Sequence, residues 1–421
     1  MELSAADLLR SFPELHTANV PRAAIVGVQM FVAGYAAWRV ALAYVLRPFH
    51  AAKPADRETR ARRLYAGQLC FVNSYFVGIV LVLVWLMEVP ISIAPYRGPA
   101  FDRPYLVLGF LGWGLAWMIA GGTFHRLRTG RSMSLVEAWH AFAFDVVCDP
   151  LLLLGLPLLA LVSDQLDGPT FAALGAAAAI YLAYRVGLGH ALLRRFGTIR
   201  PVEEPWAGIS ARVAAASGVP DLAVWRLRCS HANVFAMPGH NVYFAESLFA
   251  ELDEADFEAL LWHEVAHVRE SLVDKWLRHA AIPLLLILNA GPAVVGQWGL
   301  RGILPVFVLL YFAQKLLVRH SRRLEIAADA YGRAHTSVGA YALALRKLYR
   351  LALVPESTGM NNITHPDLRE RVAVDLAEQS GESQSPTGSI DKRRAYLGLT
   401  LYIACFLGAL AFGEWAISAS R

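Results

Sequence analysis

The stretch LLWHEVAHVRE, residues 260–270, decides how this chain is interpreted. It places His263 and His267 four residues apart, with Glu264 directly after the first histidine. On an α-helix, side chains four residues apart project from the same face and lie close enough to hold one metal ion. A catalytic zinc ion needs three protein ligands, so a zinc site here requires a third ligand elsewhere in the chain. The alternative is an amphipathic helix whose two histidines only form hydrogen bonds.

The stretch SRRLEIAADAYG, residues 321–332, supplies a candidate for that third ligand in Glu325. Asp329 follows one helical turn later on the same face, where a carboxylate can orient a ligating histidine through its second ring nitrogen. A solvated helix with two acidic residues is the alternative, but the residues between the two acids are apolar. The two stretches together predict one Zn²⁺ per chain, bound by His263, His267 and Glu325.

Glu264 lies beside the predicted ligands without being one of them. Zinc lowers the pKa of a bound water to roughly 7, and a neighbouring carboxylate can take the proton as that water attacks a carbonyl. Glu264 is therefore the predicted general base. The alternative is a surface glutamate with no chemical task.

The composition indicates a membrane protein. The 421 residues are 56% hydrophobic and only 17% charged, with a mean hydropathy of +0.41, whereas soluble domains carry about 25% charged residues. Runs of roughly 20 apolar residues can cross a bilayer. A single run is also compatible with a buried core helix, but the chain contains eight: 23–46, 66–87, 105–124, 142–162, 171–193, 280–295, 303–318 and 396–417. We therefore expect a mainly α, polytopic helical membrane protein with about eight spans.

Arginine and lysine are concentrated in alternate loops. They gather at 47–63, 126–131, 194–200, 319–323 and 392–394, whereas the loop at 163–170 contains none. The positive-inside rule then places the N-terminus outside and the catalytic helix in the cytoplasm. Nucleic-acid binding is the competing interpretation of a net charge of +5, but the clusters follow apolar runs instead of forming one basic face. No nucleic-acid partner is expected.

Short strands and a helix precede the membrane hairpin. Residues 221–229, 233–239 and 241–247 are predicted to be strands separated by turn residues, and 253–272 a long helix. The resulting domain organisation is a five-span membrane region (1–193), a cytoplasmic subdomain with a small sheet and the histidine helix (194–279), a membrane hairpin (280–318), a second catalytic subdomain with the third zinc ligand (319–379), a linker (380–394) and a last span (395–421).

Four motifs in this order carry a family resemblance. SHANVFAMPGHNVYFAESLF (230–249), HEVAH (263–267), SRRLEIAAD (321–329) and THPDLRERV (364–372) resemble the integral-membrane gluzincin family of the CAAX prenyl endopeptidases and HtpX-type proteases. The resemblance covers roughly residues 195–375. It implies a gluzincin-like α+β protease domain containing a small β-sheet, with the zinc ligands and the general base named above.

The resemblance also implies roles for three further residues. Asn233 would line the cleft and bind the substrate backbone, which agrees with its place in a strand whose edge can pair with an extended peptide. His365 would stabilise the oxyanion, although by residue type alone it is more typical of a helix cap or a surface position. Arg371 would support the ligand region, as a neighbour of the site together with Asp329.

The sequence thus predicts a membrane-embedded zinc endopeptidase that hydrolyses peptide bonds at or near the cytoplasmic membrane face. Its partners would be a peptide or membrane-protein substrate and the lipid bilayer. One alternative is a CAAX-type prenyl-protein endopeptidase, and another is a signalling or regulatory membrane metalloprotease. The last alternative is a non-catalytic scaffold that keeps the fold. The complete set of His263, Glu264, His267 and Glu325 argues against this alternative.

Overall fold

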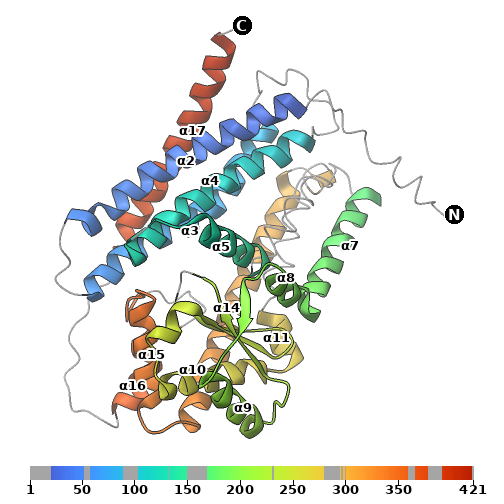
Figure 1. Cartoon of the computed structure of the whole chain (residues 1–421). Coiled ribbons are helices and arrows are strands. Elements are labelled where there is room, and N and C mark those ends of the chain that lie inside the picture. Colours follow the sequence, from blue (N-terminus) through green and yellow to red (C-terminus); the bar gives the residue numbers. More distant parts are fainter. Residues whose placement is uncertain are drawn as a thin grey trace, which may run out of the picture.

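The computed structural model describes residues 20–51, 57–88, 103–130, 132–148, 168–229, 232–278, 294, 297–298, 300–358, 366–377 and 391–419. The chain is mainly helical, with one small mixed sheet of four strands. Most of the predicted span at 280–295, and the predicted span at 142–162 beyond residue 148, lie outside the described residues. The helices form a bundle at one end of the molecule, and the sheet lies with other helices at the opposite end (Figure 1).

Four long helices make the bundle: α2 (Val20–Ala51), α3 (Arg57–Glu88), α4 (Arg103–Thr129) and α17 (Lys392–Ala419). Their shared core contains the buried rings of Trp38, Trp113 and Tyr402. The Trp38 ring centroid lies 5.6 Å from that of Trp113 and 5.1 Å from that of Tyr402. The indole N–H of Trp113 donates to the Tyr402 hydroxyl at 3.0 Å, which satisfies both polar groups inside the bundle. The C-terminal helix is thereby packed against the first.

Two glycines allow α2 and α4 to touch backbone to backbone. A Cβ atom on Gly112 would lie 1.9 Å from the carbonyl oxygen of Gly27, a separation that no side chain tolerates. Small residues at such a crossing are typical of helices packed within a membrane.

Among the described residues, two helical stretches are long and apolar enough to cross a membrane. They are Ala24–Phe49 in α2 and Lys392–Gly413 in α17, with mean hydropathies of 1.4 and 1.9. The predicted runs at 66–87 and 105–124 are helical as well, within α3 and α4. The structure therefore supports a mainly helical fold with two clear candidate spans, a smaller number than the eight predicted.

The predicted span at 171–193 is not one regular helix. It divides into α7 (Gly168–Ala183), a π-helical turn at Tyr184–Leu188 and α8 (Gly189–Arg195). Gly187 interrupts it with φ of 115°, a conformation that favours glycine. Hydropathy alone does not report such a break, because every residue around it is compatible with a helix.

The predicted span at 303–318 and the predicted ligand helix at 321–332 are parts of one helix, α14 (Leu300–Ala334). Its 35 residues extend for about 52 Å at the usual rise per residue, which exceeds the roughly 30 Å hydrocarbon thickness. The change from apolar to charged residues near 319 is therefore a change of surroundings and not the end of a helix. Glu325 consequently lies on a rigid extension of the helix.

The sheet consists of β1 (Ile199–Pro201), β2 (Ala223–Leu227), β3 (Val234–Met237) and β4 (Asn241–Ala245), in the order β1-β2-β4-β3. Strands β2 and β4 are parallel, and the other two pairs are antiparallel. Three of the strands fall within the predicted ranges, whereas the three-residue β1 was not predicted. Strand β3 is at the edge of the sheet, and its outer side forms no pair with another described strand.

Helices cover both faces of the sheet. On one face lie α9 (Trp206–Ser217), α10 (Glu254–Val268), α15 (Ala340–Leu351) and α16 (Leu368–Ala377), in one hydrophobic core with the strands. Phe244 of β4 packs on Phe257 of α10, with ring centroids 4.3 Å apart. On the other face Tyr243 packs near α8 and α5 (Leu135–Cys148). Because helices pack on both faces of the sheet, every residue of β4 is buried.

The bundle is joined to this part of the chain through the beginning of α3. The Arg57 guanidinium donates to the carbonyl oxygens of Tyr349 and Arg350 at the end of α15, the latter at 3.0 Å. The Glu58 carboxylate accepts the backbone N–H of Glu356 at 3.2 Å. A cation is favourable at the C-terminal end of a helix. The arginine-rich beginning of α3 is therefore on the same side of the bundle as the histidine helix.

Candidate active site

Helix α10 presents His263 and His267 from a buried position. Asp253 caps its first turn, accepting the backbone N–H of Asp256 at 2.8 Å in a reciprocal capping box. Most of the helix surface is buried, and His263 is only 6% exposed. The helix ends at Val268, four residues earlier than predicted, and a turn follows. The two histidines thus lie on the last turns of a helix that is held in place by its core contacts.

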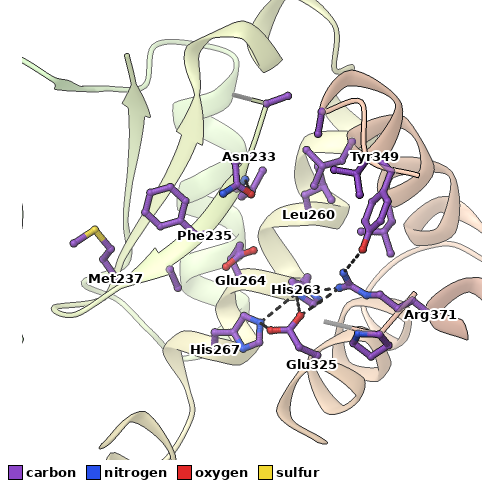
Figure 2. A pocket seen from close by; sticks show the side chains of 18 of the residues that line it. Asn233, Phe235, Met237, Leu260, His263, Glu264, His267, Glu325, Tyr349 and Arg371 are labelled. Atoms are coloured by element: carbon purple, nitrogen blue, oxygen red, sulfur yellow. Dashed lines mark hydrogen bonds and ion pairs between the residues drawn. The ribbon is translucent and has the colours of Figure 1, made fainter. Parts of the chain in front are cut away.

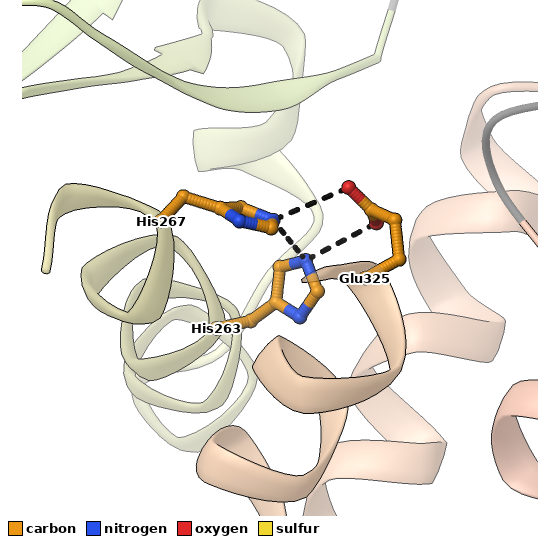
Figure 3. Close-up of side chains that lie close together, drawn as sticks. All are labelled: His263, His267 and Glu325. Atoms are coloured by element: carbon orange, nitrogen blue, oxygen red, sulfur yellow. Dashed lines mark hydrogen bonds and ion pairs between the residues drawn. The ribbon is translucent and has the colours of Figure 1, made fainter. Parts of the chain in front are cut away.

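His263, His267 and Glu325 converge on one point (Figure 3). The Nε2 atoms of the two histidines are 3.2 Å apart, and Glu325 carboxylate oxygens lie 3.4 Å from Nε2 of His267 and 3.8 Å from Nε2 of His263. Ligands about 2.0–2.1 Å from a tetrahedral zinc ion are separated by about 3.3 Å. The donor set and its spacing therefore fit Zn²⁺.

The other ring nitrogen of each histidine is held by a carboxylate. Nδ1 of His263 lies 3.1 Å from Asp329 and 2.9 Å from the Tyr341 hydroxyl. Nδ1 of His267 lies 2.6 Å from Glu270. Both Nε2 atoms consequently remain available as ligands, with the ring orientation set from behind. Glu270 was not predicted, although its place three residues after His267 was visible in the first motif.

Arg371 binds the carboxylate that holds His263. Its Nε and Nη2 atoms donate to the two oxygens of Asp329 at 2.9 and 2.6 Å, and Nη2 lies 3.6 Å from Glu325 (Figure 2). Burial by itself would raise the pKa of Asp329, but the hydrogen bonds from His263 and Arg371 outweigh it and hold that pKa well below its usual range. The structure thus places both Asp329 and Arg371 directly behind the ligands.

A cavity of about 980 Å³ opens in front of the ligands. It is lined by β3, by the ligand residues and by Glu264, which is 6% exposed and forms no hydrogen bond or ion pair with another described residue. Asn233 projects into the cleft at the beginning of β3, with Glu264 between that strand and the ligands (Figure 2). The Asn233 Oδ1 atom accepts the backbone N–H of Val234 at 3.0 Å, so its NH₂ group is the part that can face a substrate.

His365 lies outside the described residues, and the role implied for it stays a prediction. The residues that follow it, Pro366 and Asp367, line the cavity. Asp367 accepts hydrogen bonds from Ser357 at 2.9 Å and from the hydroxyl of Thr358 at 2.6 Å. These contacts join the segment after His365 to the chain that follows α15.

A family model matches the part of the chain that contains this site. Residues 206–377 match the model of peptidase family M48. Among solved structures, the crystal structure of S. mikatae Ste24p is similar, with 15% sequence identity and a TM-score of 0.48, covering 83% of this chain and 97% of that one. None of the curated proteins compared matches the chain. The matched segment contains β2 to β4, α10, Glu325 and Arg371.

Proposed function

We propose that this chain is a zinc metalloendopeptidase of the M48 type, with its zinc site at His263, His267 and Glu325. We further propose that it cleaves peptide bonds of membrane-associated substrates at the cytoplasmic membrane face. The observation that carries the proposal is the position of the ligand set. It lies inside a cavity that has an unpaired strand edge on one side and the ends of bundle helices on the other. An extended peptide and a membrane-proximal substrate both fit such a site.

Glu264 is the proposed general base. When bound, zinc polarises the substrate carbonyl and makes water a nucleophile at neutral pH. The Glu264 carboxylate lies in the cavity beside the ligands without a partner among the described residues, so it is free to accept the proton of the attacking water and to pass it to the leaving amine. Because Glu264 directly follows the ligand His263, its carboxylate is within reach of a substrate peptide bond held at the zinc site.

Strand β3 is the proposed binding site for the substrate backbone. An edge strand offers unpaired N–H and C=O groups, and an extended peptide can add to the sheet there. All four residues of β3 line the cavity, and Asn233 at its beginning can donate its NH₂ group to a substrate carbonyl. Backbone pairing of this kind binds many sequences, which suits an endopeptidase.

The bilayer orientation rests on charge. The first turns of α3, which contain Arg57, Arg60, Arg62 and Arg63, lie on the same side of the bundle as the zinc site, as the Arg57 contacts indicate. Positively charged loops of membrane proteins remain in the cytoplasm. The catalytic region would then be cytoplasmic, joined to a membrane region whose clear candidate spans are α2 and α17.

Replacement of Glu264 tests the mechanism. Glu264→Gln keeps the shape of the side chain and removes the base, so zinc content should stay at about one per chain while the turnover number falls by about 10²–10⁴ or more. Glu254→Gln, on the exposed first turn of the same helix, should cleave at the rate of the unchanged protein. Near-normal cleavage by Glu264→Gln would remove Glu264 from the mechanism.

A further inference from the structure

Arg128 lies on the cavity wall formed by the bundle, in the last turn of α4. It comes after the predicted span at 105–124, so its position is at the end of the bundle that faces the zinc site. The neighbouring helix α5 also reaches the strand edge, since the Phe144 ring lies 5.6 Å from that of Phe235 in β3. Arg128 and β3 therefore belong to walls of the same cavity.

Two nitrogens of the Arg128 guanidinium are buried without an acceptor. Its Nε and Nη1 atoms are inaccessible to solvent and have no hydrogen-bond partner among the described residues. Burial lowers the pKa of Arg128 to about 10, so the side chain remains charged at neutral pH. Buried cations are normally paired, because leaving one unpaired is costly. An unpaired one at the wall of a substrate cavity indicates that the substrate supplies the anion.

The other cations of the cavity wall already have acceptors. Arg371 is bound to Asp329, and the Lys275 ammonium donates to the backbone carbonyl of Val268 at 2.6 Å. Among the described residues that line the cavity, Arg128 is the cationic side chain that keeps two buried nitrogens without a hydrogen-bond partner.

The sheet register shows which end of β3 Arg128 is near. The Arg128 guanidinium lies near the Cys229 thiol. Cys229 follows Leu227 by two residues, and Leu227 is opposite Ala245, whose N–H donates to the Asn233 carbonyl at 2.9 Å. Cys229 and Asn233 are therefore at the same end of the sheet. Arg128 is near the beginning of β3.

Strand polarity then decides which part of the substrate meets Arg128. A peptide that pairs antiparallel with β3 has its carboxyl-side residues at the beginning of that strand. A peptide that pairs parallel would bring its amino-side residues there instead. A guanidinium binds a carboxylate and repels an ammonium group, so the charge favours the antiparallel orientation. The stretch from Asn233 to Met237 spans about 13 Å, which limits the carboxylate to within about four residues of the bond cleaved.

We propose that Arg128 is a specificity-determining residue that binds a substrate carboxylate on the C-terminal side of the scissile bond. The inference rests on the proposed peptidase function and deepens it. The carboxylate is either the free C-terminus of a short leaving segment or the side chain of an aspartate or glutamate within that segment. A bidentate Arg–carboxylate pair serves both sources equally well.

Matched peptides test the inference with purified, zinc-loaded full-length protein. One pair of fluorogenic peptides, with the C-terminus within four residues of the cleaved bond, differs only in a free carboxylate or a carboxamide there. A second pair has amidated ends and differs only in aspartate or asparagine in the leaving segment. In at least one pair, kcat/KM should be about 10-fold or more higher for the peptide with the carboxylate. Hydrogen bonds to a charged group are strong, and Arg371 and Lys275, the other described arginine and lysine of the cavity wall, already have acceptors.

Arg128→Gln should bring that ratio to about one while leaving cleavage of the uncharged peptide nearly unchanged, and this uncharged peptide reports that the variant is folded. Arg128→Lys should keep part of the preference, because the charge remains without the bidentate geometry. Arg126→Gln, on an exposed arginine of the same helix, should keep the full ratio. A ratio near one in the unchanged protein for both pairs, or an unaltered ratio in Arg128→Gln, overturns the inference alone. Failure to cleave any of the four peptides overturns the proposed function together with it.

Discussion

Glu270 offers a sharp test of how this site holds its metal. Its carboxylate lies 2.6 Å from Nδ1 of His267, and both side chains are about nine-tenths buried, with exposed fractions of 8% and 10%. The carboxylate holds the ring in the tautomer that leaves Nε2 free, and it makes that nitrogen more basic. Glu270→Ala removes both effects and leaves all three zinc ligands in place.

Loss of such a carboxylate typically weakens metal binding 10- to 100-fold, which corresponds to about 1.4–2.8 kcal/mol. We expect the loss of zinc affinity in Glu270→Ala to fall within this range, because the hydrogen bond between its carboxylate and Nδ1 of His267 is short and buried. Glu270→Gln should weaken zinc binding less, by about tenfold or below, since its amide oxygen still accepts a hydrogen bond from the Nδ1 proton of His267. Asp329 is a poorer target, because its removal leaves the buried Arg371 charge unpaired and threatens the fold itself.

The assay is competition between the protein and a chromophoric zinc chelator, in detergent at pH 7. Glu251→Ala, at an exposed glutamate before α10, serves as the control and should bind zinc with unchanged affinity. Thermal unfolding of the zinc-free proteins should not distinguish Glu270→Ala from the unchanged chain by more than a few degrees. A zinc Kd for Glu270→Ala equal to that of the control would refute the reasoning.

Three further outcomes are expected. Zinc analysis should find about one ion per chain, with most of it lost in Glu325→Ala, and full retention would mean that the third ligand is another residue. Of cysteines introduced at positions 55, 165 and 385 in intact cells, only the one at 165 should react with a membrane-impermeant reagent, and labelling at 385 would overturn the proposed orientation. Phe257→Ala should lower the free energy of unfolding by about 3–5 kcal/mol, measured by denaturant titration, because this ring is 1% exposed and packs on Phe244; a loss below about 1 kcal/mol would contradict that packing.

The ligand set was predictable because its pattern is local. His263 and His267 occupy adjacent turns of one helix, and Glu325 and Asp329 occupy adjacent turns of another, so each pair shares a face wherever its helix lies. Glu270 obeys the same logic, since it follows His267 by three residues. It was not predicted, although this spacing was visible in the sequence, because the first motif was interpreted for the ligands and the base and not for partners of the second ring nitrogen.

The membrane segments were harder to predict, for a physical reason. Hydropathy reports the surroundings of a residue and not the course of the backbone. The break at Gly187 depends on a left-handed backbone conformation inside an apolar run. The continuity of α14 likewise passes through a change from apolar to charged residues. At Gly187 the helix breaks while the residues around it stay apolar. In α14 the residues change from apolar to charged while the helix continues.

The sequence by itself determined the helix faces that carry the zinc ligands, the glutamate directly beside them, and the apolar and basic segments that indicate a membrane protein. These properties follow from periodicity and composition, which act over a few turns of chain. Only the tertiary structure decided that Glu325 and Arg371 meet His263, that β3 is an edge strand, and that two nitrogens of Arg128 are buried without a hydrogen-bond partner in the wall of the same cavity. Contacts between residues about 100 positions apart are set by how whole elements pack, and no local pattern encodes that packing.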